Sequence, residues 1–461
     1  MRTDFAALAV RPIEEASYWL ATRQKKSPPS LHHPDDCDIA VVGAGFTGLW
    51  TAHFIKALAP ETRITILEQK QTGYGGTGRN AGMVSNCIDH NHQLAQKHFG
   101  QAQAARLAQI GLANIDELAA YATDCDFVRS GQLQMALNET HLEDNLQTMA
   151  AASQLGIDGY RCLDQAQTRQ RLDSPLYKGS LYVPGGGIIN PISLVDRLQT
   201  DLQAVGVNIR EDTPVKSIQK TTGGARLILD NKQIDCKRVV LATDAYSHHL
   251  LPGLLHRFVP LYDYIIVSQP LLPEQKKQLG WQNKEGIMDG RTFFNYYRLL
   301  KDDRILWGTS DASYYGNRVD AAFDHSMRHY RELQESFDRH FPQIQTTFDY
   351  AWGGPIASTT RLTPFFGHQL DGRLLYALGY TGHGIGSTRV AGKILAHMAL
   401  DAKSELLDLD LAKKKPMPYP PEPLRSLAIK IVTSSLRKVD AGHKPNLVLF
   451  MLDRLGIGFS S

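Results

Sequence analysis

The sequence predicts an α/β protein in which a Rossmann-like domain is interleaved with an α+β domain on a mostly antiparallel sheet, followed by a helical C-terminal extension. Three observations predict this fold class. A strand-like run, a GxGxxG motif and a helical pattern follow one another over residues 38–58. A second strand, glycine-rich turn and helical pattern come late, over residues 373–400. Between them, residues 261–271, 292–300 and 303–311 show the alternation of antiparallel strands.

Composition places the chain among ordinary globular proteins. Its 461 residues, 43% hydrophobic and 21% charged, are enough for two domains or one large interleaved unit. The net charge of +3 is small and the basic residues are scattered, so we expect no nucleic-acid partner. Five cysteines without CxxC spacing argue against a disulfide framework and a metal site. Acidic residues near the start, and the lack of an apolar run of about 18 residues, predict a cytoplasmic protein that does not span a membrane.

The first glycine motif is GAGFTG, residues 43–48. In this context Gly43 permits the tight turn, Gly45 lets the backbone approach a diphosphate, and Gly48 lets helix and strand pack closely. The helix N-terminus, with Phe46 and Thr47, adds unpaired N–H groups and the positive end of a dipole. A tight turn without a ligand is the alternative, but the strand before the motif and the helix after it favour a dinucleotide.

A second strand pattern, residues 63–68, ends at Glu68, twenty residues after Gly48. An acidic side chain at this place accepts hydrogen bonds from the adenosine ribose hydroxyls and disfavours the 2′-phosphate of NADP. We expect Glu68 and the following Gln69 at the cofactor site.

The segment GYGGTGRNAGMVSN, residues 73–86, favours FAD over NAD. An NAD enzyme of this type continues into its next helix here, whereas a polar glycine-rich insertion is able to wrap a longer ligand. Arg79 is expected to pair with a phosphate, and Asn80 to bond a ribityl or pyrophosphate oxygen. A flexible loop is the alternative. The residues predicted to contact FAD here are Gly76, Thr77, Arg79, Asn80, Ala81, Gly82 and Met83.

A set of motifs in one order along the chain carries a family resemblance. They are SYWLAT (17–22), GAGFTGL (43–49), GTGRNAG (76–82), VVLATDAY (239–246), VPLYDYIIVSQPL (259–271), WGGPIASTTRLTPFFG (352–367) and GYTGHGIG (379–386). The sequence resembles the FAD-dependent amine oxidoreductases of the glycine oxidase, sarcosine oxidase and D-amino-acid oxidase superfamily. It is most similar to the gamma-glutamylputrescine oxidoreductase-like branch. The resemblance implies that Val215, Ala242 and Thr243 lie at the adenine side of FAD, and that Trp352 also contacts the cofactor.

The late run GYTGHGIG follows a strand pattern, 373–378, and precedes a helical pattern from Ser387. The resemblance implies that this helix points its N-terminus at the pyrimidine end of the flavin. Hydride arrival at flavin N5 leaves negative charge around N1 and O2, and backbone N–H groups are expected to stabilise it. These are the N–H groups of Gly382, His383, Gly384 and Ile385. His383 is also a candidate base, or a turn residue that only caps or packs.

The predicted division of the chain is an N-terminal extension (1–36), a discontinuous FAD-binding domain (37–93, 181–255 and 351–402), a substrate domain (94–180 and 256–350) and a C-terminal linker with a helical tail (403–461). The candidates to line the substrate pocket are Tyr262, Tyr264, Tyr296 and Tyr297, with packing of the sheet as the alternative. Arg298 and Arg361 are candidates to hold a substrate carboxylate bidentately, although Arg298 equally fits a surface sheet residue. The predicted catalytic residues are His383, Arg361 and Tyr297.

The resemblance implies removal of a hydride from the carbon that bears a primary or secondary amine, of a simple amine or an amino acid, giving an imine that water hydrolyses. A 2-hydroxyacid dehydrogenase and a non-catalytic flavin-binding protein are the alternatives. The covalent attachment site of the sarcosine oxidase branch falls near Thr360, and no cysteine follows Cys236, so non-covalent FAD is expected. That branch also has a lysine that promotes reaction with oxygen, whereas here the nearest is Lys301. The electron acceptor is therefore oxygen, or a quinone or carrier.

The tail begins with a proline-rich linker, KKKPMPYPPEP, and continues into helical patterns. Leu424, Leu427, Ala428 and Ile431 are predicted to share one face. Either the tail docks on the protein's own surface, or this face contacts a membrane with the help of nearby cations. Those cations are Arg425, Lys430, Arg437 and Lys438. The second possibility predicts a cytoplasmic protein that is peripheral at the inner membrane surface.

Overall fold

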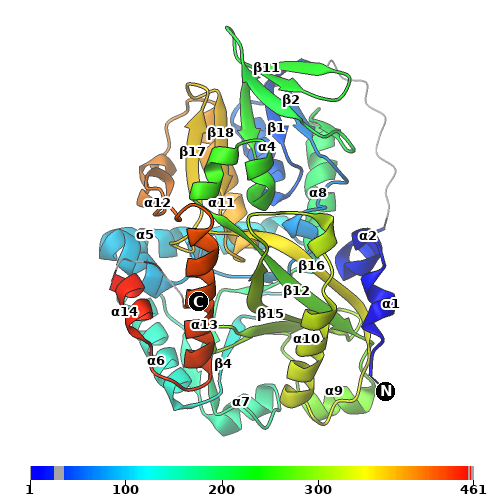
Figure 1. Ribbon diagram of the computed structural model, residues 1–461, viewed down its shortest axis with the longest axis vertical. Helices are drawn as coiled ribbons and strands as arrows, with labels where there is room; N and C mark the ends of the chain where they lie inside the picture. The colour runs from blue at the N-terminus through cyan, green and yellow to red at the C-terminus, as the bar shows by residue number, and fades with distance from the viewer. Residues whose placement is uncertain (1, 25–35, 455–456, 458–461) are drawn as a thin grey trace.

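The computed structural model describes residues 2–24, 36–454 and 457, and in that part of the chain two eight-stranded sheets carry the fold (Figure 1). The first sheet has the order β17-β18-β11-β1-β2-β8, with β10 paired to β11 and β9 to β10. Its strands are β1 (Cys37–Val42), β2 (Ile64–Leu67), β8 (Asn208–Arg210), β9 (Ser217–Lys220), β10 (Ala225–Ile228), β11 (Gln233–Leu241), β17 (Phe365–Gln369) and β18 (Leu374–Leu378). Its centre, from β18 to β8, is parallel.

Alternate residues of the first sheet face two different cores. Ile39 and Val41 of β1 belong to a core that contains the helices, whereas Ala40 and Val42 pack on the opposite face with residues of β10. Both faces are therefore covered, which explains why these strands are almost continuously apolar.

The second sheet has the order β16-β12-β15-β14-β13-β4-β6-β5. Its strands are β4 (Gln132–Ala136), β5 (Arg161–Leu163), β6 (Gly179–Val183), β12 (Val259–Ser268), β13 (Gly286–Asp289), β14 (Asn295–Leu299), β15 (Ile305–Tyr314) and β16 (Phe348–Ser358). Among the strands described, only β13 and β4 run parallel, so the prediction of a mostly antiparallel sheet is confirmed. A short pair, β3 (Met83–Val84) and β7 (Gly187–Ile188), forms a separate ribbon.

The helices are α1 (Phe5–Ala9), α2 (Ile13–Ala16), α3 (Tyr18–Ala21), α4 (Phe46–Leu58), α5 (His92–Tyr121), α6 (Glu139–Gln154), α7 (Gln165–Arg171), α8 (Pro191–Ala204), α9 (Pro273–Leu279), α10 (Met327–His340), α11 (Gly384–Ala399), α12 (Asp410–Lys413), α13 (Leu424–Asp440) and α14 (Leu447–Arg454). Short 3₁₀ turns are η1 (Gly76–Gly78), η2 (Asp244–His249), η3 (Pro252–His256), η4 (Ala321–Phe323) and η5 (Glu405–Asp408). Within the described residues, no helix combines the length and the apolar character needed to cross a bilayer.

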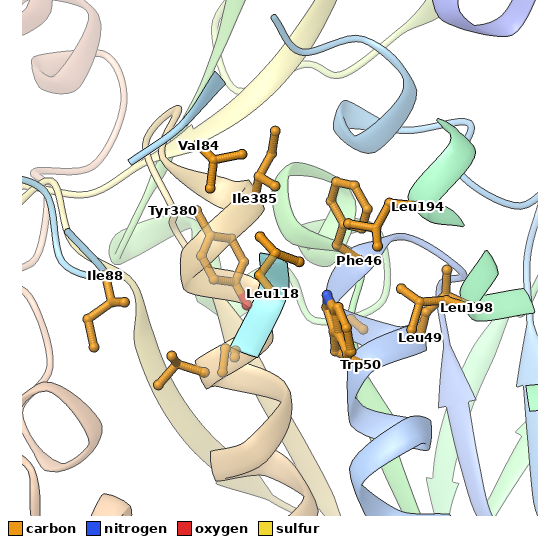
Figure 2. Close-up of a cluster of buried hydrophobic side chains, with 14 of the residues drawn as sticks. Phe46, Leu49, Trp50, Val84, Ile88, Leu118, Leu194, Leu198, Tyr380 and Ile385 are labelled. Carbon is orange, nitrogen blue, oxygen red and sulfur yellow. The ribbon is translucent and has the colours of Figure 1, made fainter. Parts of the chain in front are cut away.

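Helices α4 and α11 pack tightly on each other beside the first sheet. A Cβ atom on Gly392 of α11 would lie only 2.7 Å from the Cβ atom of Trp50 on α4, so glycine is what permits this approach. Figure 2 shows Trp50 among apolar side chains that come from α4, α8 and the start of α11. This core fixes the N-terminal ends of both helices relative to each other.

Two strands cross the domain boundaries that we expect from the sequence. Residues 351–402 were expected to belong wholly to the FAD-binding part, yet β16 pairs along its length with β12 of the second sheet. Likewise β6, which spans the expected boundary at residue 181, pairs with β4 and β5. The sheet to which each strand belongs depends on the distant strand with which it pairs. The sequence of a strand alone does not reveal that partner.

Candidate active site

A cavity of about 670 Å³ lies where the C-terminal ends of β1, β2, β11 and β18 meet the second sheet. Crevices at the carboxyl ends of parallel strands are the usual ligand sites of such sheets. One wall consists of the loops after these strands, a second of one face of the second sheet, and a third of residues 418–436 of the tail.

The first glycine loop has the tight turn and the close packing that its sequence predicts, but the N–H of Phe46 donates to Thr77 Oγ1 (3.1 Å) and is not unpaired. Gly43 has a φ of 105°, and a Cβ atom there would lie 2.6 Å from the carbonyl oxygen of Ala242. A Cβ atom on Gly48 would lie 2.0 Å from the Gly43 carbonyl oxygen. Helix α4 therefore starts directly against β1, and Gly43, Gly45, Phe46 and Thr47 line the cavity, whereas Gly48 lies behind the lining and permits the packing.

Glu68 lines the cavity just beyond the end of β2. Its Oε2 accepts a hydrogen bond from the N–H of Ala44 (2.8 Å) and its Oε1 accepts one from Lys70 (3.0 Å). Burial raises the pKa of this carboxyl group. Four further residues predicted for this end of the cofactor also line the cavity: Gln69, Val215, Ala242 and Thr243.

The loop of residues 76–83 lines the middle of the cavity, but its polar side chains do other work than predicted. The amide of Asn80 donates to the Thr77 carbonyl (2.7 Å) and accepts from the Gly82 N–H (2.8 Å), so it holds the loop's own shape. Apart from Asn80 and Arg79, the residues of this loop that line the cavity are Gly76, Thr77, Ala81, Gly82 and Met83.

Arg79, predicted to pair with a phosphate, lines the cavity, and its guanidinium group already has partners in the protein. Its Nη1 donates to Asp324 at 2.6 Å, its Nε donates to the Tyr74 carbonyl at 3.1 Å, and the side chain is buried. The guanidinium charge is thus already paired, and it ties the loop to the segment before α10. Trp352, predicted as a cofactor contact, lies outside the lining and donates its Nε1 hydrogen to the Arg79 carbonyl (2.9 Å).

The N-terminal segment holds the same loop from the other side, a role that the sequence did not reveal. Ser17 Oγ donates to the Gly78 carbonyl (2.7 Å), and Trp19 Nε1 donates to the Asn80 carbonyl (2.7 Å). A Cβ atom on Gly78 would lie 2.9 Å from Leu20. The only signal in the sequence was the motif SYWLAT, to which no function could be assigned.

The second glycine run is a strand-to-helix turn, as predicted, but α11 begins at Gly384, three residues before the expected Ser387. The N–H of His383 donates to the Tyr380 carbonyl (3.0 Å), so it is not free for a ligand. The helix start leaves the N–H groups of Gly384 and Ile385 without intrahelical partners at the cavity wall. Gly382, with a φ of 85°, lines the same wall.

A hydrogen bond joins the two glycine loops. Thr47 Oγ1 on α4 donates to Oη of Tyr380, the second residue of the late glycine run, at 2.9 Å. Together with the packing of α4 on α11, this bond places two helix N-termini on one cavity.

His383 lines the cavity beside a second histidine that the sequence did not single out. The rings of His383 and His90 lie 4.2 Å apart, centroid to centroid. His90 is buried, and neither of its ring nitrogens has a hydrogen-bond partner in the described part of the chain. Burial lowers the pKa of both imidazoles. The polar run that follows residues 73–86, with Asp89, His90 and His92, was the available signal.

Strand alternation in the second sheet divides the candidate tyrosines. Tyr296 lines the cavity, whereas Tyr262, Tyr264 and Tyr297 lie in the core on the opposite face with α10. Tyr297 Oη bonds Tyr177 Oη, and its ring stacks on Trp307 at 4.3 Å. Tyr297, predicted as a catalytic residue, therefore faces away from the cavity, because successive residues of a strand point to opposite faces of the sheet.

Neither predicted carboxylate-binding arginine reaches the cavity. Arg361 Nη2 donates to the Pro364 carbonyl (3.1 Å) and its Nη1 to the Lys414 carbonyl (3.2 Å). Arg298 Nη1 donates to the carbonyls of Gly82 and Ile189. Both are buried braces of the backbone, so the predicted catalytic role of Arg361 is wrong.

The tail forms the third wall, which the sequence did not predict. Ala428, Ile429, Val432 and Leu436 of α13 line the cavity, while Leu424, Leu427 and Ile431 are exposed on its outer side. The predicted common face is therefore split, since Ala428 turns inward. Asp440 at the end of α13 accepts hydrogen bonds from the N–H groups of Thr292 (2.7 Å) and Phe293 (2.9 Å).

Arg425, at the start of α13, is a cavity-lining arginine that was predicted only as a surface cation. It is buried, and its Nη1 donates to Asn317 Oδ1 (2.7 Å) while its Nε donates to the Pro420 carbonyl (2.9 Å). Both acceptors are neutral.

The lining fits an elongated ligand that joins a diphosphate to an aromatic ring system, as FAD does. The N-termini of α4 and α11 both open onto this cavity. A Cβ atom on Gly45 would come within 3.0 Å of Thr77 and would narrow the access of a ligand to the N-terminus of α4. Val215, between β8 and β9, and Gly384, at the start of α11, line this same cavity. Residues around Glu68 would hold the adenosine, the α4 N-terminus the diphosphate, and the α11 N-terminus the ring.

Comparison with known proteins agrees with this fit. The family model "FAD dependent oxidoreductase" (DAO) matches residues 38–398. The probable oxidoreductase OrdL of Haemophilus influenzae is 28% identical over 427 residues, which cover 90% of this chain and 95% of that protein. Gamma-glutamylputrescine oxidoreductase of Escherichia coli is 28% identical over 390 residues, covering 83% and 88%.

Solved structures share the fold. Glycine oxidase from Geobacillus kaustophilus superposes with a TM-score of 0.66 at 20% identity, covering 82% of this chain and 99% of that one. L-proline dehydrogenase from P. horikoshii gives a TM-score of 0.68 at 17% identity, covering 81% and 96%.

Proposed function

The chain belongs to the DAO family of FAD-dependent oxidoreductases, and on that premise we propose that it oxidises a primary or secondary amine, or an amino acid, to an imine that water then hydrolyses. The observation that carries this proposal is the single cavity in which both cofactor loops meet a chamber walled by the second sheet and α13. The relatives named for gamma-glutamylputrescine and glycine oxidation support an amine as the donor.

Bound in this cavity, FAD would supply the two-electron acceptor for the hydride on the carbon beside the amine nitrogen. It is held non-covalently, and none of the described residues that line the cavity is a cysteine. The N–H groups of Gly384 and Ile385, with the dipole of α11, stabilise negative charge at the adjoining end of the cavity. The chamber walls orient the donor carbon and exclude water.

His383 is the proposed acceptor of the proton from a substrate ammonium. Its Nδ1 lies 3.4 Å from the Thr381 carbonyl, which only accepts hydrogen bonds, so Nδ1 carries the hydrogen and Nε2 keeps its lone pair. Burial lowers the pKa of this imidazole, which keeps it neutral at pH 7. For an amino-acid substrate, Arg425 replaces Arg361 and Arg298 as the candidate partner of the carboxylate.

The test is anaerobic mixing of the purified yellow protein with amines, amino acids and 2-hydroxyacids, followed by the loss of flavin absorbance. We expect bleaching by amines or amino acids. Bleaching by 2-hydroxyacids alone would establish the hydroxyacid alternative, and no bleaching by any donor would establish a flavin-binding protein without turnover. The variant His383→Gln should retain FAD and reduce it about a hundredfold more slowly, whereas His98→Gln, outside the cavity lining, should reduce it at the wild-type rate.

We infer that the electron acceptor is a membrane quinone, reached by docking of α13 and α14 on an anionic lipid surface. Leu427 of α13 is 55% exposed and Phe450 of α14 is also 55% exposed. Exposed lysines accompany them: Lys430, Lys438 and Lys444. Figure 1 shows the two helices close together on one side of the molecule. Lys301 lies away from the cavity lining, paired with Asp126, so it does not act as an oxygen-promoting lysine.

Vesicle sedimentation tests the docking. Full-length protein should sediment with anionic vesicles, and the double variant Leu427→Asp/Ile431→Asp should stay in the supernatant with its flavin spectrum intact. Equal recovery of both proteins in the supernatant would contradict lipid docking. Reoxidation of the reduced protein should be faster with a quinone analogue than with oxygen, and the reverse order would establish an oxidase.

A further inference from the structure

Asp263 is a carboxylate on the cavity floor that the cofactor does not account for. It lies on β12, where Leu261, Asp263 and Ile265 face the cavity and Tyr262 and Tyr264 face the core behind the sheet. Asp263 lies between Tyr262 and Tyr264 of β12, and the pairing of β12 with β15 shifts in register between these two residues. This shift marks a β-bulge. Bulges in strands commonly re-aim side chains beside functional sites.

Two neutral donors hold the carboxylate in one orientation. Tyr296 Oη donates to Asp263 Oδ2 at 2.6 Å, and the N–H of Tyr264 donates to Oδ1 at 2.7 Å. The ring of Tyr296 reaches Asp263 by lying across Gly308 of β15, where a Cβ atom would come within 2.3 Å of the ring. Glycine at 308 is thus a requirement of the Tyr296–Asp263 contact.

Two buried carboxylates in or beside this sheet have a cationic partner, whereas the partly buried Asp263 has none among the residues described. Glu285 pairs with Arg171 at 2.5 Å and Asp289 pairs with Arg291 at 2.6 Å. Over the described ranges, no lysine, arginine or histidine lies within ion-pair distance of Asp263.

The surroundings of Asp263 disfavour its negative charge. The nearby acid Asp311, on β15, is already paired with Arg437 of α13 at 2.8 Å. Burial raises the pKa of Asp263 to about 7, with a smaller contribution from the charge of Asp311. A buried carboxylate without a counter-ion is costly, and a bound cation removes that cost.

We propose that Asp263, oriented by Tyr296, binds a positively charged nitrogen of the substrate in the chamber. This rests on the proposed function and gives it a substrate class: donors that enter the cavity as alkylammonium ions. Apolar side chains that line the same cavity, Leu261, Ile265 and Met288 on the sheet and Val432 on α13, suit the carbon chain of such an ion. Asp263 takes part here in binding, and the proton transfer stays with His383.

The test uses a cation that cannot be oxidised. Tert-butylammonium has no hydrogen on the carbon that bears nitrogen, so it binds without reducing the flavin, and tert-butanol is its neutral isostere. Binding of each to the oxidised holoenzyme is followed by the change in the flavin absorption spectrum. Wild-type protein should bind the cation at least about tenfold more tightly than the alcohol.

Three variants complete the experiment. Asp263→Asn should weaken cation binding roughly tenfold to a hundredfold and leave the alcohol unchanged. Tyr296→Phe keeps the ring over Gly308 and removes only the hydroxyl group, so a loss of about threefold is expected. Asp311→Asn is the matched control, which removes the same charge outside the cavity lining and should retain the preference for the cation.

Equal binding of cation and alcohol by the wild type would overturn the proposal, and so would equal losses in Asp263→Asn and Asp311→Asn. Failure of amines to bleach the flavin would instead overturn the proposed function. The two failures are distinguishable, because tert-butylammonium binding requires no turnover.

Discussion

At the scale of single residues, Gly48 shows how completely the first loop depends on a missing side chain. Its Cβ position lies 2.0 Å from the Gly43 carbonyl oxygen, which is backbone and unable to move aside cheaply. Gly48→Ala should therefore lower the free energy of unfolding by roughly 1–3 kcal/mol and reduce the FAD content of the purified protein. Denaturant unfolding and flavin absorbance measure the two effects.

Gly253→Ala is the matched control for this substitution. A Cβ atom at Gly253 would meet nothing within 4 Å, so both stability and FAD content should stay at wild-type values. Equal behaviour of the two variants would mean that close packing of α4 on β1 is not what Gly48 provides.

The raised pKa of Asp263 predicts a pH dependence of cation binding. Burial raises this pKa to about 7, so the carboxyl group loses its charge as the pH falls through that value. Tert-butylammonium keeps its charge throughout, since amines of this kind titrate near pH 10. Its affinity should thus be constant above about pH 7 and fall by about tenfold for each pH unit below it.

The groups that face Asp263 do not change the predicted direction, which is a loss of cation affinity as the pH falls. Tyr296 donates a neutral hydrogen bond, and Asp311 remains paired with Arg437. Asp263→Asn should abolish the pH dependence, and spectral titrations between about pH 5 and pH 9 check it. A wild-type affinity that stays constant over this range would mean that Asp263 does not carry the cation.

Prediction from sequence succeeded for residues whose role follows from the backbone near them. The positions Gly43, Gly45 and Gly48 are set by a local strand–turn–helix unit, so a motif identifies them. It failed where a side chain's direction depends on register, as at Tyr296 and Tyr297, since a shift of one residue exchanges the two faces of a strand. It failed also where charge is paired over long distance, as for Arg79 and Asp324, which are 245 residues apart.

At the scale of elements, helix α13 forms a wall of the chamber in which the substrate is proposed to bind. Val432 faces the cavity, and the neighbouring Ile431 is 43% exposed. Val432→Trp should fill part of the chamber and raise KM for bulky amines about tenfold, with FAD content unchanged. Ile431→Trp, one residue away on the outer face, should leave KM unchanged.

Steady-state kinetics with amines of increasing size decide this prediction. A KM that increases equally in both variants would mean that α13 acts through general stability and does not form a chamber wall.

The helical character of the tail was predictable from its periodicity, but its position was not. Its apolar residues occur on both the inner and the outer side, so amphipathic spacing alone does not say which side packs on the protein. Contacts such as that of Asp440 with the N–H groups of Thr292 and Phe293 fix the choice, and they join segments that lie far apart in the sequence.

At the scale of the whole molecule, both ends of the chain lie outside the family match of residues 38–398, and both reach the cavity region. The N-terminal segment braces the loop of residues 76–83 through Trp19, and the tail roofs the chamber. Trp19→Phe removes the hydrogen bond to the Asn80 carbonyl, so FAD should dissociate about fivefold more readily. Titration of the apoprotein with FAD, followed by flavin fluorescence, measures the change.

Trp281→Phe is the control for the loss of an indole. Trp281 is buried in the core behind the second sheet, and its Nε1 has no hydrogen-bond partner within the described residues. Its substitution should leave FAD affinity unchanged. Identical affinities for the two variants and the wild type would show that Trp19 does not support the cofactor loop.

The contribution of the tail to the cavity also imposes an order of assembly. During synthesis the N-terminal part of a chain emerges and folds first. Both glycine loops, ending at Gly386, are complete before residues 418–436 leave the ribosome, so the groups that hold FAD exist before the roof of the chamber does. The loops of the cofactor site and the sheet that carries Asp263 are thus synthesised before the helix that roofs the chamber.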